Sequence, residues 1–219
     1  MLLADARLPT GAHTQSAGLE PALRAGTTVD DIPSYLLSRL RTVVRVEAGA
    51  AVLARRQVTD VDDRSDLTSR LAAVDDAWRA RTVSPALREN AQVLGRGYLR
   101  LLRGLWPDDA GVRALVGVEK PSRGVVLGVA GAAAGLSGVQ VARLVGYDDA
   151  QTVAAAALKL EPMDPTRAAR WVVQAATEIE NLAELAGLTS IDDLPAAAAP
   201  LIEEWAEQHA VVRQRLFRA

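Results

Sequence analysis

Apolar residues separated by three or four positions recur along most of the chain, and this spacing constrains the fold more than any other feature. The segment from residue 32 to residue 52 is an example, with apolar residues at Ile32, Tyr35, Leu36, Leu40, Val43, Val44, Ala51 and Val52. The spacing indicates one long helix or two abutting ones with a shared apolar face. Alternating strand patterns with Asn-Gly or Asp-Gly turns are absent. The sequence therefore predicts an all-α fold.

Helix starts are marked by capping residues. Thr28 with Asp31 three positions later resembles a capping box. Ser84-Pro85 and Asp164-Pro165 each combine a side-chain N-cap with a proline at the first helical position, where its missing N–H costs nothing. These signals predict helices from about 85 to 104, from about 165 to 187 and, after Pro200, a last one.

The connections between these helices are short. We expect loops at residues 59–66, 105–111, 146–149, 161–164 and 188–199. None of these is long enough or of low enough complexity to be a domain linker. The sequence predicts a single compact domain over residues 1–219, with roughly eight to ten helices.

One segment without charged residues is about as long as a membrane-spanning helix. Residues 124–142 run for 19 residues between Arg123 and Arg143, about the length that crosses a bilayer. Five glycines, Ser137 and Gln140 leave too few large apolar residues for insertion. We expect a buried helix whose small residues let a neighbour approach closely. The first eight residues carry Asp5 and Arg7 and do not resemble an export signal, so we expect a cytoplasmic protein that does not bind membranes.

Composition excludes much of the chemistry that enzymes of this size use. The chain has no cysteine, which excludes disulfides, thiolate catalysis and iron–sulfur ligation. A P-loop needs lysine followed by serine or threonine. Both lysines fail this test, because Lys120 precedes Pro121 and Lys159 precedes Leu160. The residues predict neither a catalytic site nor a bound cofactor.

Metal binding depends on the two histidines, His13 and His209, which meet only if the fold brings them together. We interpret His209 as a buried helix residue with a satisfied hydrogen bond. His13 lies in an unusual loop and is the better candidate for a ligand. The acidic cluster of Asp60, Asp62, Asp63 and Asp66 lacks the EF-hand pattern and is interpreted as a solvated loop. We predict no metal site.

Two segments have residue patterns that helix packing alone does not explain. In residues 8–20, Pro9 and Gly11 set an unusual backbone path and polar residues follow without amphipathic order. A tight turn with a helix cap is the structural alternative. At the other end, residues 213–219 are basic and hold Leu216 and the single phenylalanine, Phe217. Chain ends usually lose large apolar groups, so this end is expected to dock, either on a partner or on its own chain.

At these residues the chain resembles the urease accessory protein UreF family. The family begins with Leu-Pro-x-Gly-Gly-aromatic and then Ser-x-Gly-Leu-Glu. Here the two motifs read Leu8-Pro9-Thr10-Gly11-Ala12-His13 and Ser16-Ala17-Gly18-Leu19-Glu20. Lys159-Leu160-Glu161-Pro162 is similar to a family segment, and His209 followed by Arg215-Leu216-Phe217-Arg218 is similar to the family's ending.

The chain departs from the family pattern at several positions. Ala12 replaces the second glycine and His13 replaces the usual aromatic residue, so we expect one left-handed backbone position fewer in the loop. Asp164-Pro165 stands where the family usually has Gly-Gln. These departures affect the details of partner contacts and leave the fold prediction unchanged.

The resemblance implies an all-α, non-catalytic and usually dimeric protein. Members bind the accessory protein UreD, also called UreH, and recruit the GTPase UreG, which delivers nickel to apo-urease. The resemblance implies a partner surface in the segment from Pro9 to Glu20, with Arg215, Phe217 and Arg218 docking on UreD. For Lys159 two interpretations stay open: by resemblance it contacts the GTPase, and as a helix end it extends its ammonium group into solvent. The expected partner-binding residues are Pro9, Gly11, His13, Ser16, Gly18, Glu20, Lys159, Arg215, Phe217 and Arg218.

Two other classes of function are compatible with an all-α chain of this length. An all-α ligand-binding transcription regulator is the alternative function, but it needs a basic helix-turn-helix. Acidic residues outnumber basic ones in residues 1–40, and the net charge of -2 gives no basic face for nucleic acid. An all-α enzyme with a carboxylate metal site would show paired Glu-x-x-His motifs, and neither histidine forms one.

Overall fold

The computed structural model describes residues 2–5, 8–60, 66–212 and 216–217, and in these residues every regular element is a helix. The all-α prediction is confirmed. The α-helices are α1 (Leu19–Arg24), α2 (Ile32–Arg41), α3 (Val43–Thr59), α4 (Leu67–Arg81), α5 (Pro85–Leu105), α6 (Ala110–Val116), α7 (Arg123–Ala133), α8 (Gly138–Leu160), α9 (Pro165–Gln174), α10 (Ala176–Asn181) and α11 (Pro200–Ala210). Short 3-10 helices are η1 (Leu2–Ala4), η2 (Ala12–Thr14), η3 (Val29–Asp31), η4 (Leu182–Gly187) and η5 (Ile191–Asp193).

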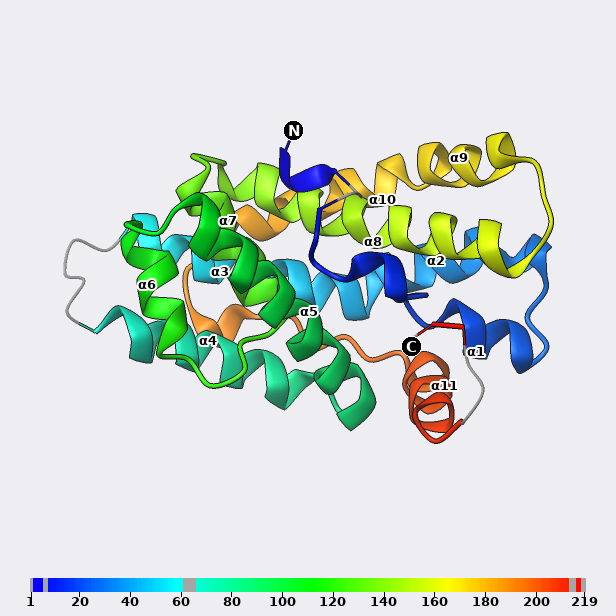
Figure 1. Ribbon diagram of the computed structural model, residues 1–219, viewed down its shortest axis with the longest axis horizontal. Coiled ribbons are helices and arrows are strands. Elements are labelled where there is room, and N and C mark those ends of the chain that lie inside the picture. Colours follow the sequence, from blue (N-terminus) through cyan, green and yellow to red (C-terminus); the bar gives the residue numbers. More distant parts are fainter. Residues whose placement is uncertain (1, 6–7, 61–65, 213–215, 218–219) are drawn as a thin grey trace.

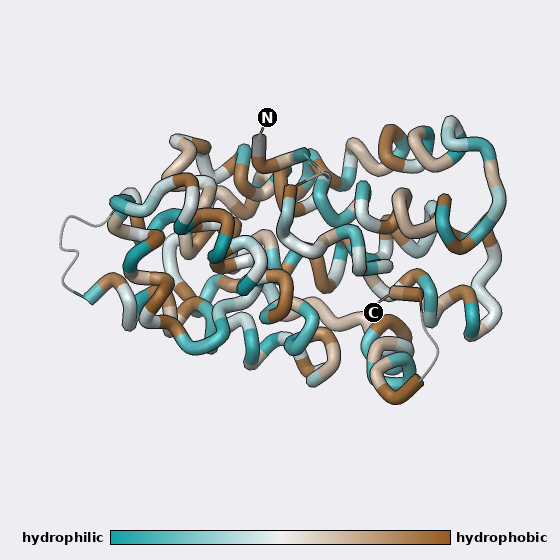
Figure 2. Tube along the Cα trace, in the orientation of Figure 1, coloured by the Kyte–Doolittle hydropathy of each residue, from teal (hydrophilic) through white to brown (hydrophobic). Residues whose placement is uncertain are grey.

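The core is built around α3, which packs against α7 and α8 (Figure 1). Gly128 of α7 makes the closest approach, since a Cβ atom there would lie 2.1 Å from the carbonyl oxygen of Ala51. Residues 123–131 of α7 are all buried, as expected of a helix enclosed by its neighbours. Along the outer helices, hydrophilic and hydrophobic residues alternate in Figure 2, because each has one buried and one solvated face.

The predicted helix starts are confirmed. Thr28 and Asp31 form a capping box that opens η3 and leads into α2. The Ser84 hydroxyl accepts from the Leu87 N–H at 3.1 Å at the start of α5. The Asp164 carboxylate accepts from the Thr166 N–H at 2.8 Å at the start of α9. Each cap satisfies a backbone donor that has no partner inside its helix.

Three predicted helical segments each contain more than one helix. Residues 32–52 form the two abutting helices α2 and α3, which separate at Thr42, so the second of the two predicted alternatives is confirmed. Residues 124–142 belong to two helices, because a left-handed turn at Gly135 separates α7 from α8. The long helix predicted after Asp164 is divided into α9, α10 and η4, which ends at Gly187 as predicted.

The loop predicted at residues 146–149 is wrong, because this segment lies inside α8. Gly146 is the point at which Leu182 packs against the helix, since a Cβ atom there would lie 2.6 Å from the Leu182 Cδ1. The carboxylates of Asp148 and Asp149 pair with buried arginines rather than with solvent. Contacts with other helices therefore explain why glycine and two aspartates, which resemble a turn in the sequence, lie within a helix.

The two ends of the described chain lie on the same side of the bundle. The N-terminal segment crosses α5 at Gly97, where a Cβ atom would lie 2.0 Å from the Thr10 carbonyl oxygen. Helix α11 packs against α1 and α5, and the last described residues return to α1 (Figure 1). In the part of the chain that the structure describes, no helix has the length and apolar character needed to span a membrane.

Candidate functional site

The segment from residue 8 to residue 20 follows a backbone path that two glycines permit. Gly11 has φ 88° and leads into η2, where the Thr14 hydroxyl donates to the Gly11 carbonyl at 2.8 Å. Gly18 has φ 77°, and a Cβ atom there would lie 2.6 Å from the Tyr35 hydroxyl oxygen. Ala12 is not among the residues with positive φ, as expected from its substitution for glycine. Ala17 is also left-handed, with φ 50°, so the path of this segment depends on Gly11, Ala17 and Gly18.

Buried polar groups hold the segment on the helical body. The Tyr35 hydroxyl donates to the carbonyl oxygen of Ala17 at 2.6 Å, and burial raises its pKa to about 12, so it stays protonated. Ser16 is fully buried, and its hydroxyl accepts from the Glu20 N–H at 3.3 Å at the start of α1. The tight turn considered above is thus present, and Ser16 satisfies a first-turn N–H of α1, although the N-cap residue itself is Gly18.

Glu20 connects the two ends of the chain. Its side chain is 3% exposed, and its two carboxylate oxygens accept from the N–H groups of Leu216 at 2.9 Å and Phe217 at 2.7 Å. Arg24 donates to the same carboxylate at 2.7 Å. Hydrogen bonds to a charged acceptor are stronger than those between neutral groups, so this carboxylate fixes the backbone of residues 216–217.

His209 of α11 completes this contact. Its Nε2 lies 3.2 Å from the Phe217 carbonyl oxygen and 3.5 Å from a carboxylate oxygen of Glu20. The side chain is fully buried, which confirms its interpretation as a buried residue with a satisfied hydrogen bond. We call the group of Glu20, His209, Leu216 and Phe217 the terminal junction. Phe217 is buried within it, so this end of the chain docks on its own body.

Lys159, in the last turn of α8, lies beside the terminal junction. Its Nζ donates to the carbonyl oxygen of His13 at 3.2 Å and lies 5.2 Å from the centroid of the Phe217 ring, a cation–π distance. Lys159, His13 and Phe217 also line a cavity of about 90 Å³ with Tyr147 and Gln151 of α8. Lys159, one residue before the end of α8, thus contacts both terminal segments of the chain.

The structure therefore brings together most of the residues that the sequence identified. Pro9, His13 and Lys159 are exposed, Gly11 is partly exposed, and Ser16, Gly18, Glu20 and Phe217 are buried. Leu216 is 63% exposed, so an apolar side chain faces solvent beside the buried Phe217. Arg215 and Arg218 lie outside the described residues.

Next to this region, the interior holds an ion network that the sequence analysis missed. Arg39 of α2 donates to both carboxylate oxygens of Asp149, at 2.9 and 2.6 Å. Arg123 of α7 donates to both oxygens of Glu47, at 2.8 and 2.6 Å, and to Asp148 at 3.1 Å. We call these five residues the interior ion network. It joins α2, α3, α7 and α8.

The charges in this network are unequal, with two guanidinium groups facing three carboxylates. Burial raises the pKa of Asp148, and the nearby Asp149 and Glu47 add to the effect while Arg123 opposes it. Burial also raises the pKa of the neighbouring Tyr98 hydroxyl. Asp149 could have been found in the sequence, since it falls on the apolar stripe of Ala142, Val145 and Val153 at helical spacing.

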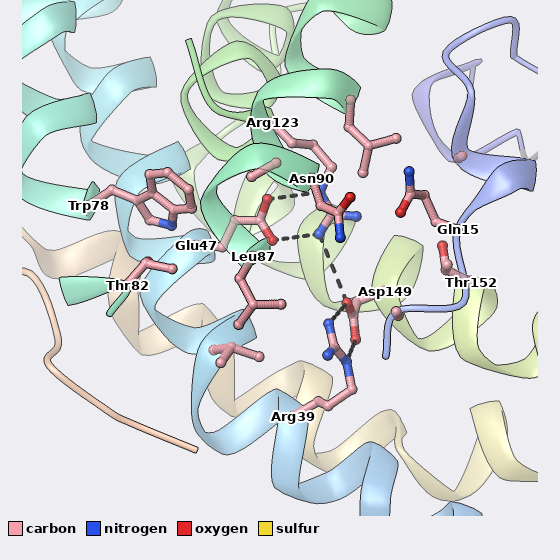
Figure 3. A pocket seen from close by; sticks show the side chains of 15 residues that line it. Gln15, Arg39, Glu47, Trp78, Thr82, Leu87, Asn90, Arg123, Asp149 and Thr152 are labelled. Carbon is pink, nitrogen blue, oxygen red and sulfur yellow. Dashed lines mark hydrogen bonds and ion pairs between the residues drawn. The ribbon is translucent and has the colours of Figure 1, made fainter. Parts of the chain in front are cut away.

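The network forms one wall of a cavity of about 80 Å³ beneath the N-terminal segment (Figure 3). Trp78, Leu87 and Leu94 form the apolar side. Arg39 Nη1 and Gln15 Nε2 are buried donors at this cavity without a hydrogen-bond acceptor in the described residues. The cavity is large enough for ordered water, which would satisfy both donors.

The described residues offer little for metal or acid–base chemistry. The carboxylates of the interior ion network are engaged by arginine, and Glu20 is engaged by backbone N–H groups. Among the described residues, no group of three or more His, Cys, Asp or Glu side chains could hold a metal ion. His13 is exposed, and its backbone carbonyl accepts the hydrogen bond from Lys159. The arrangement is suited to holding segments of chain together.

Comparison with known proteins agrees with the terminal motifs. The sequence model of the UreF family matches residues 27–176. The urease accessory protein UreF of Mycobacterium marinum is 35% identical over 221 residues, which cover 99% of this chain and 96% of the relative. The chain belongs to the UreF family. The urease accessory protein UreF of Mycobacterium bovis is 34% identical over 95% of this chain and 92% of the relative, and that of Mycolicibacterium vanbaalenii is 32% identical over 99% and 96%.

The family match and the terminal junction cover different parts of this UreF chain. Residues 27–176 contain the interior ion network and Lys159. Glu20, His209, Leu216 and Phe217 lie outside that range, although the relatives align with nearly the whole chain. At the two ends, the resemblance therefore rests on the terminal motifs and on the alignment with these relatives.

Proposed function

We propose that the chain is a non-catalytic adaptor that works in the cytoplasm during urease maturation. It binds the accessory protein UreD, also called UreH, and recruits the GTPase UreG for nickel insertion into apo-urease. The observation that carries the proposal is membership of the UreF family along nearly the whole chain. Residues 1–219 act as a single domain, and the active form is a homodimer.

The terminal junction supports a division of roles among the residues expected to bind partners. Ser16, Gly18, Glu20 and Phe217 are buried, so they position the surface rather than touch a partner directly. The groups available to a partner are the exposed residues of the same region, namely Pro9, His13, Lys159 and Leu216. By resemblance to the family, Arg215 and Arg218 are also expected to bind UreD.

As an adaptor, the protein acts by binding one state of the GTPase more tightly than another. Only such a difference in affinity couples nucleotide turnover to transfer of the metal, because equal binding of both states shifts no equilibrium. The nickel ion is cargo in this proposal, and no residue of this chain is assigned to it.

The decisive experiment is co-purification of the chain with the UreD and UreG homologues of its organism. We expect a complex that contains all three proteins and elutes at a size consistent with a dimer of this chain. Absence of that complex, together with normal urease activation in a strain that lacks the gene, would refute the adaptor function.

The docking surface is tested by two changes at the C-terminus. Deletion of residues 215–219 should leave a folded helical protein that no longer binds UreD. Because the deletion also removes the buried Phe217, Leu216→Asp provides a milder test, as only the backbone of Leu216 contacts Glu20. Val173→Asp is the matched control, since Val173 is an equally exposed apolar residue on α9. Equal UreD binding by the Leu216 and Val173 variants would contradict the assignment.

A further inference from the structure

Four exposed arginines gather on α5 and α6 without an ion-pair partner in the described residues. Elsewhere in the described residues, exposed arginines such as Arg41 and Arg143 form ion pairs, with Glu178 and Glu180. Arg170 of α9 is exposed without an ion pair, but it stands alone and has Asp164 as a nearby charge. The four are all exposed, and within the described residues no hydrogen bond, ion pair or ring contact engages any of them. We call these residues, Arg96, Arg100, Arg103 and Arg113, the arginine surface.

Helix geometry brings the four guanidinium groups to one face. Arg96, Arg100 and Arg103 follow one another at intervals of four and three residues on α5, which places them on the same side of the helix. Arg113 belongs to α6, which packs against α5 (Figure 1). Arg103 and Arg113 line one groove of about 300 Å³ together with Val116. The surface is therefore continuous across the two helices.

In the free chain this arrangement is unfavourable. Like charges four residues apart on a helix repel one another, and no carboxylate of the described residues forms an ion pair with these arginines. Guanidinium groups bind carboxylates through two parallel hydrogen bonds, and they are enriched at protein interfaces for this reason. Exposed Leu105 and Val116 add apolar contact beside the charges. A ligand that fits must bring carboxylates and some apolar surface.

The flanking residues favour an acidic protein segment over a continuous polyanion. Glu89 on α5 and Asp108 beside the groove are exposed, and both would repel a nucleic acid or an anionic bilayer that extended past the four arginines. The net charge of -2 gives no wider basic face. We propose that the arginine surface binds a short acidic segment of a partner protein, which lies across α5 and enters the groove between Arg103 and Arg113.

The test compares two charge-reversed proteins with the same net charge. Arg100→Glu/Arg103→Glu alters the arginine surface, and Arg167→Glu/Arg170→Glu alters two arginines at the same spacing on α9. The probe is a fluorescein-labelled peptide of repeated Glu-Leu-Glu-Ser units, followed by fluorescence anisotropy. We expect the wild type and the α9 variant to bind it alike and the α5 variant to bind about tenfold more weakly, because each exposed charge contact changes affinity a few-fold. Added sodium chloride should weaken the binding.

Several outcomes would overturn the proposal. Equal peptide binding by the two variants would remove the arginines from the interface. Tighter binding of a single-stranded oligonucleotide or of phosphatidylglycerol vesicles than of the peptide would assign the surface to another class of ligand. A change in oligomeric state caused by Arg100→Glu/Arg103→Glu alone would assign it to contact between copies of this chain.

Co-expression with the urease proteins separates this inference from the proposed function. If the wild type and the α9 variant co-purify with their partners and the α5 variant loses one of them, the acidic segment belongs to that partner. If all three proteins assemble equally, the arginine surface is not part of the assembly and the inference fails while the adaptor function stands. If none assembles but the peptide result holds, the adaptor function fails and the inference stands.

Discussion

Asp149 in the interior and Glu20 near the chain ends are both almost fully buried, yet they are satisfied in different ways. Asp149 faces the guanidinium of Arg39, so the contact joins two long helices through side chains. Glu20 faces the backbone N–H groups of Leu216 and Phe217, so the contact holds a short segment at the end of the chain. The interior carboxylate is therefore expected to act on the stability of the bundle, whereas Glu20 is expected to act on a terminal segment whose separation leaves the core folded.

The largest effect is expected from Asp149→Ala. Removal of one partner leaves a buried arginine charge uncompensated, and we expect the free energy of unfolding to fall by about 3–5 kcal/mol in urea denaturation. The control is the double variant Arg39→Met/Asp149→Leu, which removes both charges and should recover much of that loss. If the double variant is as unstable as the single one, packing rather than charge accounts for the role of this pair.

A smaller effect on the whole fold is expected from Glu20→Ala. The variant leaves the buried N–H of Phe217 and the partly buried N–H of Leu216 without their acceptor, at a cost of about 1–3 kcal/mol if the segment stays in place. We expect the segment to separate instead, so hydrogen exchange at the Leu216 and Phe217 amides should accelerate while exchange in α3 and α8 stays slow. Glu20→Gln keeps an acceptor and should show a smaller acceleration. Unchanged exchange at these two amides would show that other contacts hold the segment.

The interior ion network also predicts a pH dependence whose sign can be stated. Because burial raises the pKa of Asp148, the folded state holds this proton more tightly than the unfolded chain does. The contribution of Asp148 to stability is therefore present at low pH and is lost as pH rises from near the ordinary value of 3.8 through its raised folded pKa. Relative to Asp148→Asn, which cannot ionise, the wild type should lose stability over this rise. A wild type that gains stability relative to the variant would reverse the assignment.

The smallest effect on stability is expected from Lys159→Met. The variant loses one exposed hydrogen bond and one cation–π contact but keeps the apolar stem, so we expect the change to be below about 1 kcal/mol. If Lys159 contacts the GTPase, recruitment of UreG should weaken while binding of UreD remains. Lys120→Met, which changes the chain's other lysine, is the control in both the thermal melt and the co-purification. Equal UreG recruitment by both variants would leave Lys159 with a structural role only.

Local signals made much of the fold predictable. The caps at Thr28, Ser84 and Asp164 are formed as expected, because the side chain and the N–H that it satisfies lie within three residues of each other. The motifs at the two ends were also identified as unusual. Their contact with each other was not, because Glu20 and Phe217 are separated by 197 positions and no local pattern records such a pairing.

The errors have a common physical cause. Asp148 and Asp149 follow Gly146 and resemble a solvent-exposed turn in the sequence. An unpaired carboxylate is costly to bury, so two adjacent aspartates predict exposure to solvent. Arg39 lies 110 positions away from Asp149 and offsets that cost. In the same way, the sequence does not distinguish the unpaired arginines of α5 from a paired one such as Arg143. The partner of Arg143 is Glu180, which lies on another helix, so no local pattern predicts the pair.

By itself, the sequence determined the helical class, most helix starts and the resemblance to the UreF family, since periodicity, capping and motifs are properties of neighbouring residues. Only the tertiary structure decided which carboxylates are buried with arginine, that Phe217 docks on its own chain, and which arginines remain exposed without a partner. These outcomes depend on contacts between helices that are far apart in the sequence, and burial turns such contacts from weak surface pairs into strong constraints.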